Sequence, residues 1–228
     1  MNAIELHERI TENKDWATLL FVLCLGIVTV NKSISWARFS EFIRLGYSDK
    51  YNKIYRDSGN LKDSFTVSMF FLQLISFSFF IVLVLQQFNP QEKNMLILYI
   101  QVFTFLSVFV LSKFLLEKII ATAFKIEEFN EQFNLLKVNY RTYLSLLLLP
   151  INIILYYNPI QSTTFFWLLI IVLFALNVVT YIIALKLYQN LLIRKIFYFI
   201  LYLCTLEIAP YYFIYNWFTK IREKLCQI

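Results

Sequence analysis

The residue of this sequence best suited to chemistry is a single acid inside a long apolar segment. Glu207 lies in the run from about Ile196 to Phe218, which is long enough to cross a bilayer. At ~1.5 Å per residue, its carboxyl group would lie roughly 16 Å deep, near the midplane. An ionised, unpaired carboxylate there costs on the order of 3 kcal/mol. Pro210 follows in the next turn and frees a backbone carbonyl beside the acid. A proton-binding site and a structural carboxyl group both fit Glu207.

Few other polar side chains interrupt the apolar segments. We expect each to make an interhelical hydrogen bond worth about 0.6 kcal/mol, with a role in substrate binding as the alternative. These residues are Gln73, Gln101, Asn152 and Asn177. Lys113 lies near the end of its segment, where we expect its ammonium group to snorkel to the interface; the alternative is a buried partner for Glu207. Glu117 lies one helical turn after Lys113 and can pair with it on the same face.

The residues that usually bind metals or form disulfides are scattered. The three cysteines and the one histidine have no neighbours at ligand spacing, and an odd number of cysteines gives no disulfide framework. These residues are Cys24, Cys204, Cys226 and His7. Three acids of the longest polar connection are interspersed with lysines in no known metal-binding pattern: Asp49, Asp57 and Asp63. We therefore predict no metal, no cofactor and no enzymatic activity.

The composition is that of a membrane protein. Of the 228 residues, 59% are apolar and 16% are charged, whereas soluble domains carry about 45–50% and ~25%. We predict an all-α, polytopic transmembrane helix bundle that forms one integral membrane domain over residues 1–228. Six apolar segments are expected to span the bilayer. They cover approximately residues 16–34, 64–88, 95–117, 142–157, 164–187 and 196–218.

The first loop, residues 32–63, is the longest polar connection and is basic. Its aromatic residues recur at three- and four-residue steps with basic residues among them, which is typical of an amphipathic helix in the membrane interface. A second amphipathic stretch is expected in the third loop. The first-loop helix either docks a partner or acidic lipid, or packs against the bundle as a plain loop helix. The candidate docking residues are Arg38, Phe39, Phe42, Arg44, Lys50, Tyr51, Lys53, Tyr55 and Arg56.

The basic residues also predict an orientation. Fifteen lysines and arginines fall in loops one, three and five, and six fall in the termini and the even loops. The positive-inside rule then places loops one, three and five in the cytoplasm. The basic residues after the last segment disagree with this orientation, and a last segment that re-enters at Pro210 would remove the disagreement. The net charge of +6 is thus explained by topology and lipid headgroups, and we expect no nucleic-acid partner.

Residues along nearly the whole chain resemble those of one particular family. They are Asp15-Trp16 before the first segment, Arg38-Phe39, Phe42-Ile43, Asp49-Lys50-Tyr51 and Tyr55 after it, and Leu203-Cys204, Leu206-Glu207 and Pro210 in the last. The chain is similar to an uncharacterised integral-membrane family of Bacteroidota, described as a domain of unknown function. The resemblance implies a bacterial inner-membrane location, often with a gene for uroporphyrinogen-III synthase nearby. It implies no activity.

Three functions are compatible with these observations. The first is a non-catalytic component or accessory subunit of a membrane assembly, in contact with the lipid bilayer and with a membrane-protein partner or further copies of itself. The second is a small proton-coupled transporter or permease that uses Glu207, with Pro210 breaking the helix and Asn177, Asn152 and Gln73 lining a path. The third is an enzyme acting on a lipid or isoprenoid, which usually needs paired carboxylates, histidines or a metal.

Overall fold

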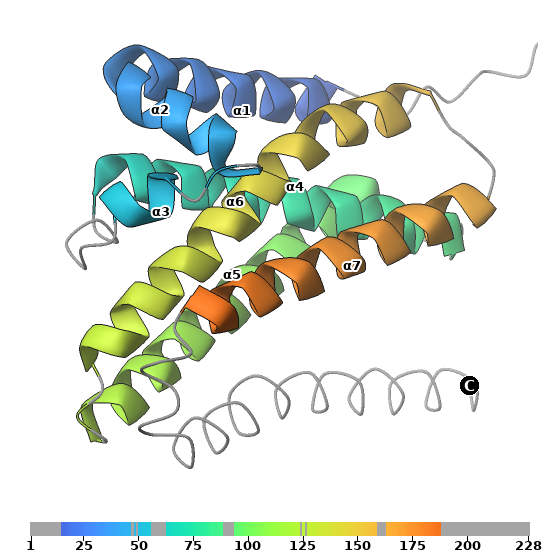
Figure 1. Ribbon diagram of the computed structural model, residues 1–228. Coiled ribbons are helices and arrows are strands. Elements are labelled where there is room, and N and C mark those ends of the chain that lie inside the picture. Colours follow the sequence, from blue (N-terminus) through green and yellow to red (C-terminus); the bar gives the residue numbers. More distant parts are fainter. Residues whose placement is uncertain are drawn as a thin grey trace, which may run out of the picture.

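The computed structural model describes residues 15–46, 48, 50–55, 63–88, 94–123, 125, 127–158 and 163–187. Throughout these residues the secondary structure is helical, without a strand. Figure 1 shows the helices as one bundle. In chain order they are α1 (Asp15–Ile34), α2 (Trp36–Ile43), the 3-10 helix η1 (Arg44–Gly46), α3 (Lys50–Ile54), α4 (Ser64–Phe88), α5 (Met95–Ala123), α6 (Glu127–Tyr157) and α7 (Thr163–Leu187).

The described helices include five that are long and apolar enough to cross a membrane. Three of them, α1, α4 and α7, match expected spans to within a residue. An Asn-Pro pair directly follows the last residue of α4 and of α6. Both helices end there because a proline disfavours the helical conformation of the residue before it. The helices are those of an all-α, multi-pass membrane protein. The expected sixth span, residues 196–218, lies outside the described residues.

The third loop agrees in part with its prediction. An amphipathic stretch was expected to extend the helix of residues 95–117 past the membrane, and α5 does continue to Ala123 before α6 begins at Glu127. Pro150 lies inside α6, as membrane helices tolerate when neighbouring groups satisfy the freed carbonyl. The remainder of the predicted stretch is the first half of α6. Asn130, Asn134 and Lys137 of this half are buried between helices, whereas Glu127 is exposed and Glu131 is half-buried.

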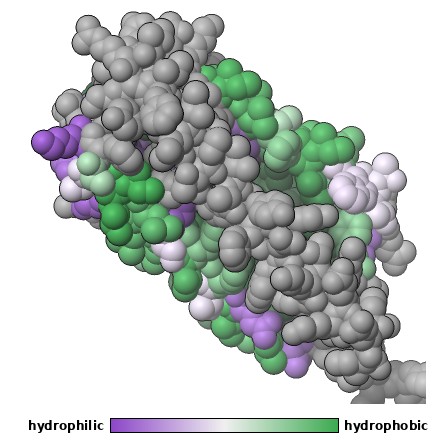
Figure 2. All heavy atoms as spheres, turned by 90° about the horizontal axis from the view of Figure 1, so that it is seen from below, coloured by the Kyte–Doolittle hydropathy of each residue, from purple (hydrophilic) through white to green (hydrophobic). Residues whose placement is uncertain are grey.

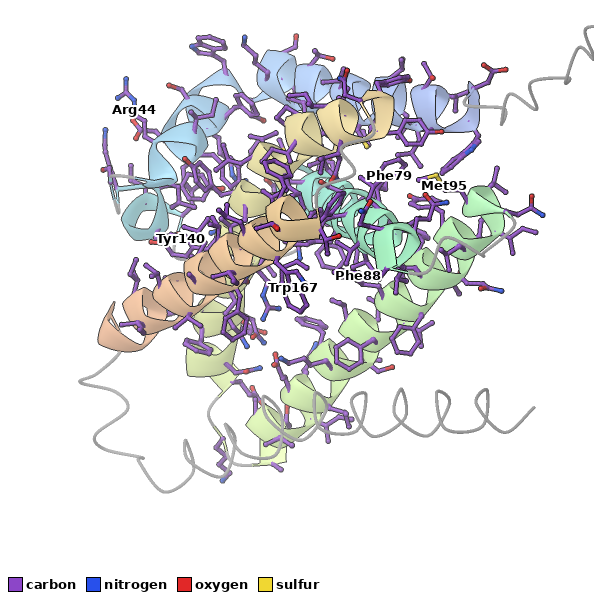
Figure 3. All side chains as sticks on the ribbon, turned by 90° about the vertical axis from the view of Figure 1, so that its right-hand side faces the viewer. Arg44, Phe79, Phe88, Met95, Tyr140 and Trp167 are labelled. Atoms are coloured by element: carbon purple, nitrogen blue, oxygen red, sulfur yellow. The ribbon has the colours of Figure 1, made fainter. Side chains whose placement is uncertain are left out.

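Helix α4 lies at the centre of the bundle, in contact with α1, α5 and α6. The two larger of the three apolar clusters found among the described residues lie against it. The first joins α2, η1 and α3 to the start of α4 and the first half of α6, through Phe39, Phe42, Leu45, Tyr51, Phe65, Met69, Phe133, Leu136 and Tyr140. The second joins the opposite ends of the helices, where the Trp16 ring lies 5.5 Å from Tyr99 and 6.4 Å from Tyr156. Phe88 also meets Trp167 of α7 at 5.7 Å (Figure 3).

The outer helices leave much of their apolar surface uncovered by the chain. In the most apolar stretch of α4, 56% of the residues are buried inside the bundle, whereas the corresponding shares are 17% in α5 and 6% in α7. Figure 2 shows broad apolar areas on the face seen from below. Helices with such outward faces are suited to contact lipid or other membrane proteins.

Candidate functional site

A buried ion pair joins α5 to α6. The Lys137 ammonium group donates to the Glu117 carboxylate at 3.2 Å, and the two side chains are only 7% and 4% exposed. Lys113 is buried as well, one helical turn before Glu117, so its ammonium group does not snorkel to solvent as expected. Counted back from Tyr157 at ~1.5 Å per residue, Lys137 lies roughly 30 Å along α6, which is about the thickness of the hydrocarbon core. A span that begins at Tyr157 would therefore hold these charges near the opposite boundary of the membrane and not at its midplane.

Two asparagines and an aromatic ring surround this pair. The Asn130 amide donates to the Glu117 backbone carbonyl at 3.4 Å, and the Asn134 amide donates to the Asn130 side chain at 3.3 Å. The Lys137 ammonium group also lies 4.8 Å from the centre of the Phe133 ring. Residues three and four apart share one face of a helix, which explains why these side chains of α6 reach α5 together. The asparagines thus bond the Glu117 backbone and each other, while the charge of Lys137 is engaged by the ion pair and by the cation–π contact.

The polar contacts continue along the interface of α4 and α6. The Thr142 hydroxyl donates to the Gln73 side-chain carbonyl at 3.0 Å. The Ser76 hydroxyl donates to the Ser145 carbonyl at 3.1 Å, and the Asn152 amide donates to the Ser76 carbonyl at 2.9 Å. We call this set, from the ion pair to Asn152, the polar seam. The interhelical hydrogen bonds predicted for Gln73 and Asn152 are confirmed.

One end of the polar seam retains a buried atom without a hydrogen-bond partner among the described residues. It is the side-chain oxygen of Asn152, which is 1% exposed, and the Ser78 hydroxyl of α4, outside the seam and 0% exposed, has no such partner either. A buried amide oxygen without a donor is costly, and a bound water is the usual way in which such a group is satisfied.

A second buried charge fixes the first loop onto the bundle. Arg38 is 8% exposed; its Nε donates to the Tyr51 hydroxyl at 3.2 Å and its Nη2 to the Thr66 hydroxyl at 3.0 Å. Its guanidinium group also forms an ion pair with Asp63 and stacks 4.8 Å from the Phe65 ring. Burial raises the pKa of the Tyr51 phenol, and the Arg38 charge opposes this rise, so the phenol stays protonated at neutral pH. Arg38 thus ties α2 and α3 to the beginning of α4.

Comparison with known proteins gives a family and no activity. The family described as a domain of unknown function (DUF4271) matches residues 17–218. The chain belongs to this family. The match extends from the first turn of α1 to beyond α7, and it confirms the resemblance to a domain of unknown function. No curated protein matches the chain. No solved structure matches it either.

Several residues predicted to dock a partner are part of the core in this DUF4271 chain. Arg38, Phe39, Phe42 and Tyr51 are all buried, so they are not available to a partner, and the alternative prediction of a loop helix packed against the bundle holds for them. The reason is that their aromatic side is covered by α4 and the first half of α6. Of the other candidates, Arg44 and Lys50 are exposed and Tyr55 is half-buried. The Lys53 side chain and Arg56 lie outside the described residues.

The intramembrane candidates are only partly brought together. Gln73 and Asn152 both belong to the polar seam, whereas Asn177 donates to the Leu173 carbonyl of its own helix α7 at 2.9 Å, so its predicted interhelical bond is wrong. Glu207 and Pro210 lie outside the described residues. No group of three or more possible metal ligands occurs in the part of the chain that the structure describes.

Sequence reasoning missed the burial of Lys137. It lies among charged residues of a stretch that was expected to follow the membrane surface. The available signal was the spacing of the polar residues Asn130, Asn134 and Lys137 at steps of three and four, which places them on one face of a helix. That face lies against Glu117 of α5.

Proposed function

We propose that this protein is a non-catalytic subunit of a membrane assembly in the bacterial inner membrane. The observation that carries the proposal is the outer face of α7. Along it, large apolar side chains recur at helical spacing and are more than half exposed: Trp167 (54%), Leu168 (57%), Ile171 (62%) and Phe174 (70%). Aromatic and aliphatic side chains in such a row suit the packing of a neighbouring transmembrane helix. The partner is another integral membrane protein or a second copy of the chain.

The interior supports a structural role for the polar groups. The buried charges of Arg38, Glu117 and Lys137 are each engaged in an ion pair. In the polar seam, Thr142 and Ser76 donate to atoms of the facing helix. Polar groups that hold helices together in this way need no substrate to account for them.

The distribution of charge supports the proposed orientation. The described lysines and arginines all lie in the half of the bundle that contains the α1–α4 connection and the α5–α6 turn. Positive residues favour the cytoplasmic side. This half, which holds loops one and three, is therefore proposed to face the cytoplasm, with loop five on the same side.

Purification of the tagged full-length chain from native membranes in mild detergent tests this function. We expect one membrane protein, or a second copy of the chain, in a fixed stoichiometric ratio. The variant Ile171→Ala/Phe174→Ala on α7 should lose that partner. The matched variant Ile97→Ala/Ile100→Ala, on exposed positions of α5 (51% and 53%), should keep it. A monodisperse single chain that copurifies with no partner would overturn the proposal.

A second candidate function is a proton-coupled permease, and one specific observation favours it. The polar seam runs from the Glu117–Lys137 pair at one membrane boundary to Asn152, whose side-chain oxygen is unpaired. A seam that admits water beside such a group suits a proton path. In proteoliposomes with a pH-sensitive dye inside, this function requires Glu207→Gln to slow the collapse of an imposed pH gradient. A rate equal to that of protein-free liposomes removes the candidate.

A further inference from the structure

The outward face of α2 is distinct from the buried face that holds it in place. Phe39 and Phe42 pack into the bundle at 5% and 1% exposure, but Trp36 is 62% and Ile43 46% exposed. Ile34, the last residue of α1, is 80% exposed. Large apolar side chains thus stand outward just where a membrane-spanning helix ends.

Two cations accompany these side chains. The Lys32 ammonium group lies 5.3 Å from the centre of the Trp36 ring, close enough for a cation–π contact. Arg44 is exposed and directly follows α2 as the first residue of η1, and Figure 3 shows it standing at the edge of the bundle. Neither cation forms an ion pair within the described residues, whereas the nearby Lys50 pairs with Glu41 at 3.0 Å.

We propose that this α1–α2 corner, formed by Lys32, Ile34, Trp36, Ile43 and Arg44, binds the headgroups of anionic phospholipids. Lys32 lies in the last turn of α1, which places its charge at the level of the headgroups. Tryptophan prefers that level, because its ring is apolar and its N–H needs a polar partner. Lysine and arginine donate to phosphate oxygens, the arginine with two parallel hydrogen bonds.

Charge complementarity selects lipid over a protein partner at this surface. The corner offers two cations without an ion pair to any described residue, beside apolar groups at the end of a span, and the leaflet supplies phosphates and acyl chains at the same level. The buried Arg38, Phe39 and Phe42 fix the helix that carries these groups, so little ordering is needed on binding. This inference is independent of the proposed role in an assembly.

Native mass spectrometry of the full-length chain in mild detergent tests the proposal. The chain is titrated with phosphatidylglycerol, which is anionic, and in parallel with zwitterionic phosphatidylcholine. Each cation near an anionic headgroup contributes roughly a five-fold gain in affinity. Lys32→Gln/Arg44→Gln should therefore bind phosphatidylglycerol about 10- to 25-fold more weakly, with phosphatidylcholine binding unchanged.

The matched control is Lys118→Gln/Lys125→Gln, which removes two exposed cations in the same half of the molecule, one in the last part of α5 and one in the α5–α6 turn. It should keep phosphatidylglycerol affinity within two-fold of the parent. Equal losses in both double variants would show diffuse attraction and overturn the site, as would unchanged affinity in the corner variant. Loss of a copurifying protein with unchanged lipid affinity would also overturn it, in favour of protein docking. Unchanged melting curves show that either variant is folded.

Discussion

Removing one partner of the buried Glu117–Lys137 pair should strongly destabilise the bundle. In Glu117→Gln, the Lys137 ammonium group at 3.2 Å loses its counter-charge while it stays buried at 7% exposure. Breaking a buried pair from one side costs about 3–5 kcal/mol, because an uncompensated charge remains. We therefore expect the loss for Glu117→Gln to fall within that range.

The complementary variant should cost less. In Lys137→Met, the Glu117 carboxylate keeps Lys113 on its own helical face, and the methionine fills most of the lysine volume. The expected loss is about 3 kcal/mol. The double variant Glu117→Gln/Lys137→Met removes both charges and should cost well under the sum of the single losses, by about 2 kcal/mol or more.

Equilibrium unfolding in mixed micelles of mild detergent and SDS, followed by tryptophan fluorescence, measures these differences. Lys118→Met, an exposed lysine next to Glu117 on α5, is the matched control and should change the free energy of unfolding by less than about 0.5 kcal/mol. Additive losses in the double variant would refute the coupling of Glu117 and Lys137. So would a Lys137→Met protein as stable as the control.

Other changes test the first loop and the polar seam. Phe42→Ala should lower the free energy of unfolding by about 3–5 kcal/mol, because the side chain is fully buried, whereas Ile43→Ala, at the exposed neighbouring position, should lower it by under about 1 kcal/mol. Denaturant unfolding compares the two variants, and equal losses would contradict the packing of α2. Arg38→Lys should lower the free energy of unfolding by about 2–3 kcal/mol, since one ammonium group cannot replace hydrogen bonds from both Nε and Nη2. Arg44→Lys should leave stability unchanged, and equal melting temperatures for the two variants would show that Arg38 does not hold the first loop in this way. Thr142→Val should lower the free energy of unfolding by only about 0.6 kcal/mol. If this variant is stable but no longer supports growth of cells that depend on the protein, the result would favour the permease.

The positions of the membrane helices were readable from the sequence because the signal is local. A run of apolar residues without a helix breaker, such as the one from Ser64 to Phe88, can satisfy its backbone in a bilayer only as a helix. The ends of such a run are also marked locally, by proline or polar residues. Helical periodicity likewise showed that α2 has an aromatic side.

What covers each helical face could not be read from the sequence. Arg38 meets Asp63 and Lys137 meets Glu117 across separations of 25 and 20 residues, and no local pattern specifies such a pairing. An aromatic face beside basic residues looks the same whether lipid or another helix covers it. The first half of α6 was misjudged for this reason, because Phe133 and Lys137 are covered by the chain itself.

Site-specific photo-crosslinking in native membranes tests the central claim of a membrane assembly most directly. A photoreactive phenylalanine analogue replaces Phe174, which is 70% exposed on α7, and in a matched protein replaces Phe166, which is 5% exposed on the same helix. We expect the position of Phe174 to yield one discrete adduct with another membrane protein or a second copy of the chain, and that of Phe166 to yield none. Lipid adducts alone from Phe174 would contradict the proposed assembly.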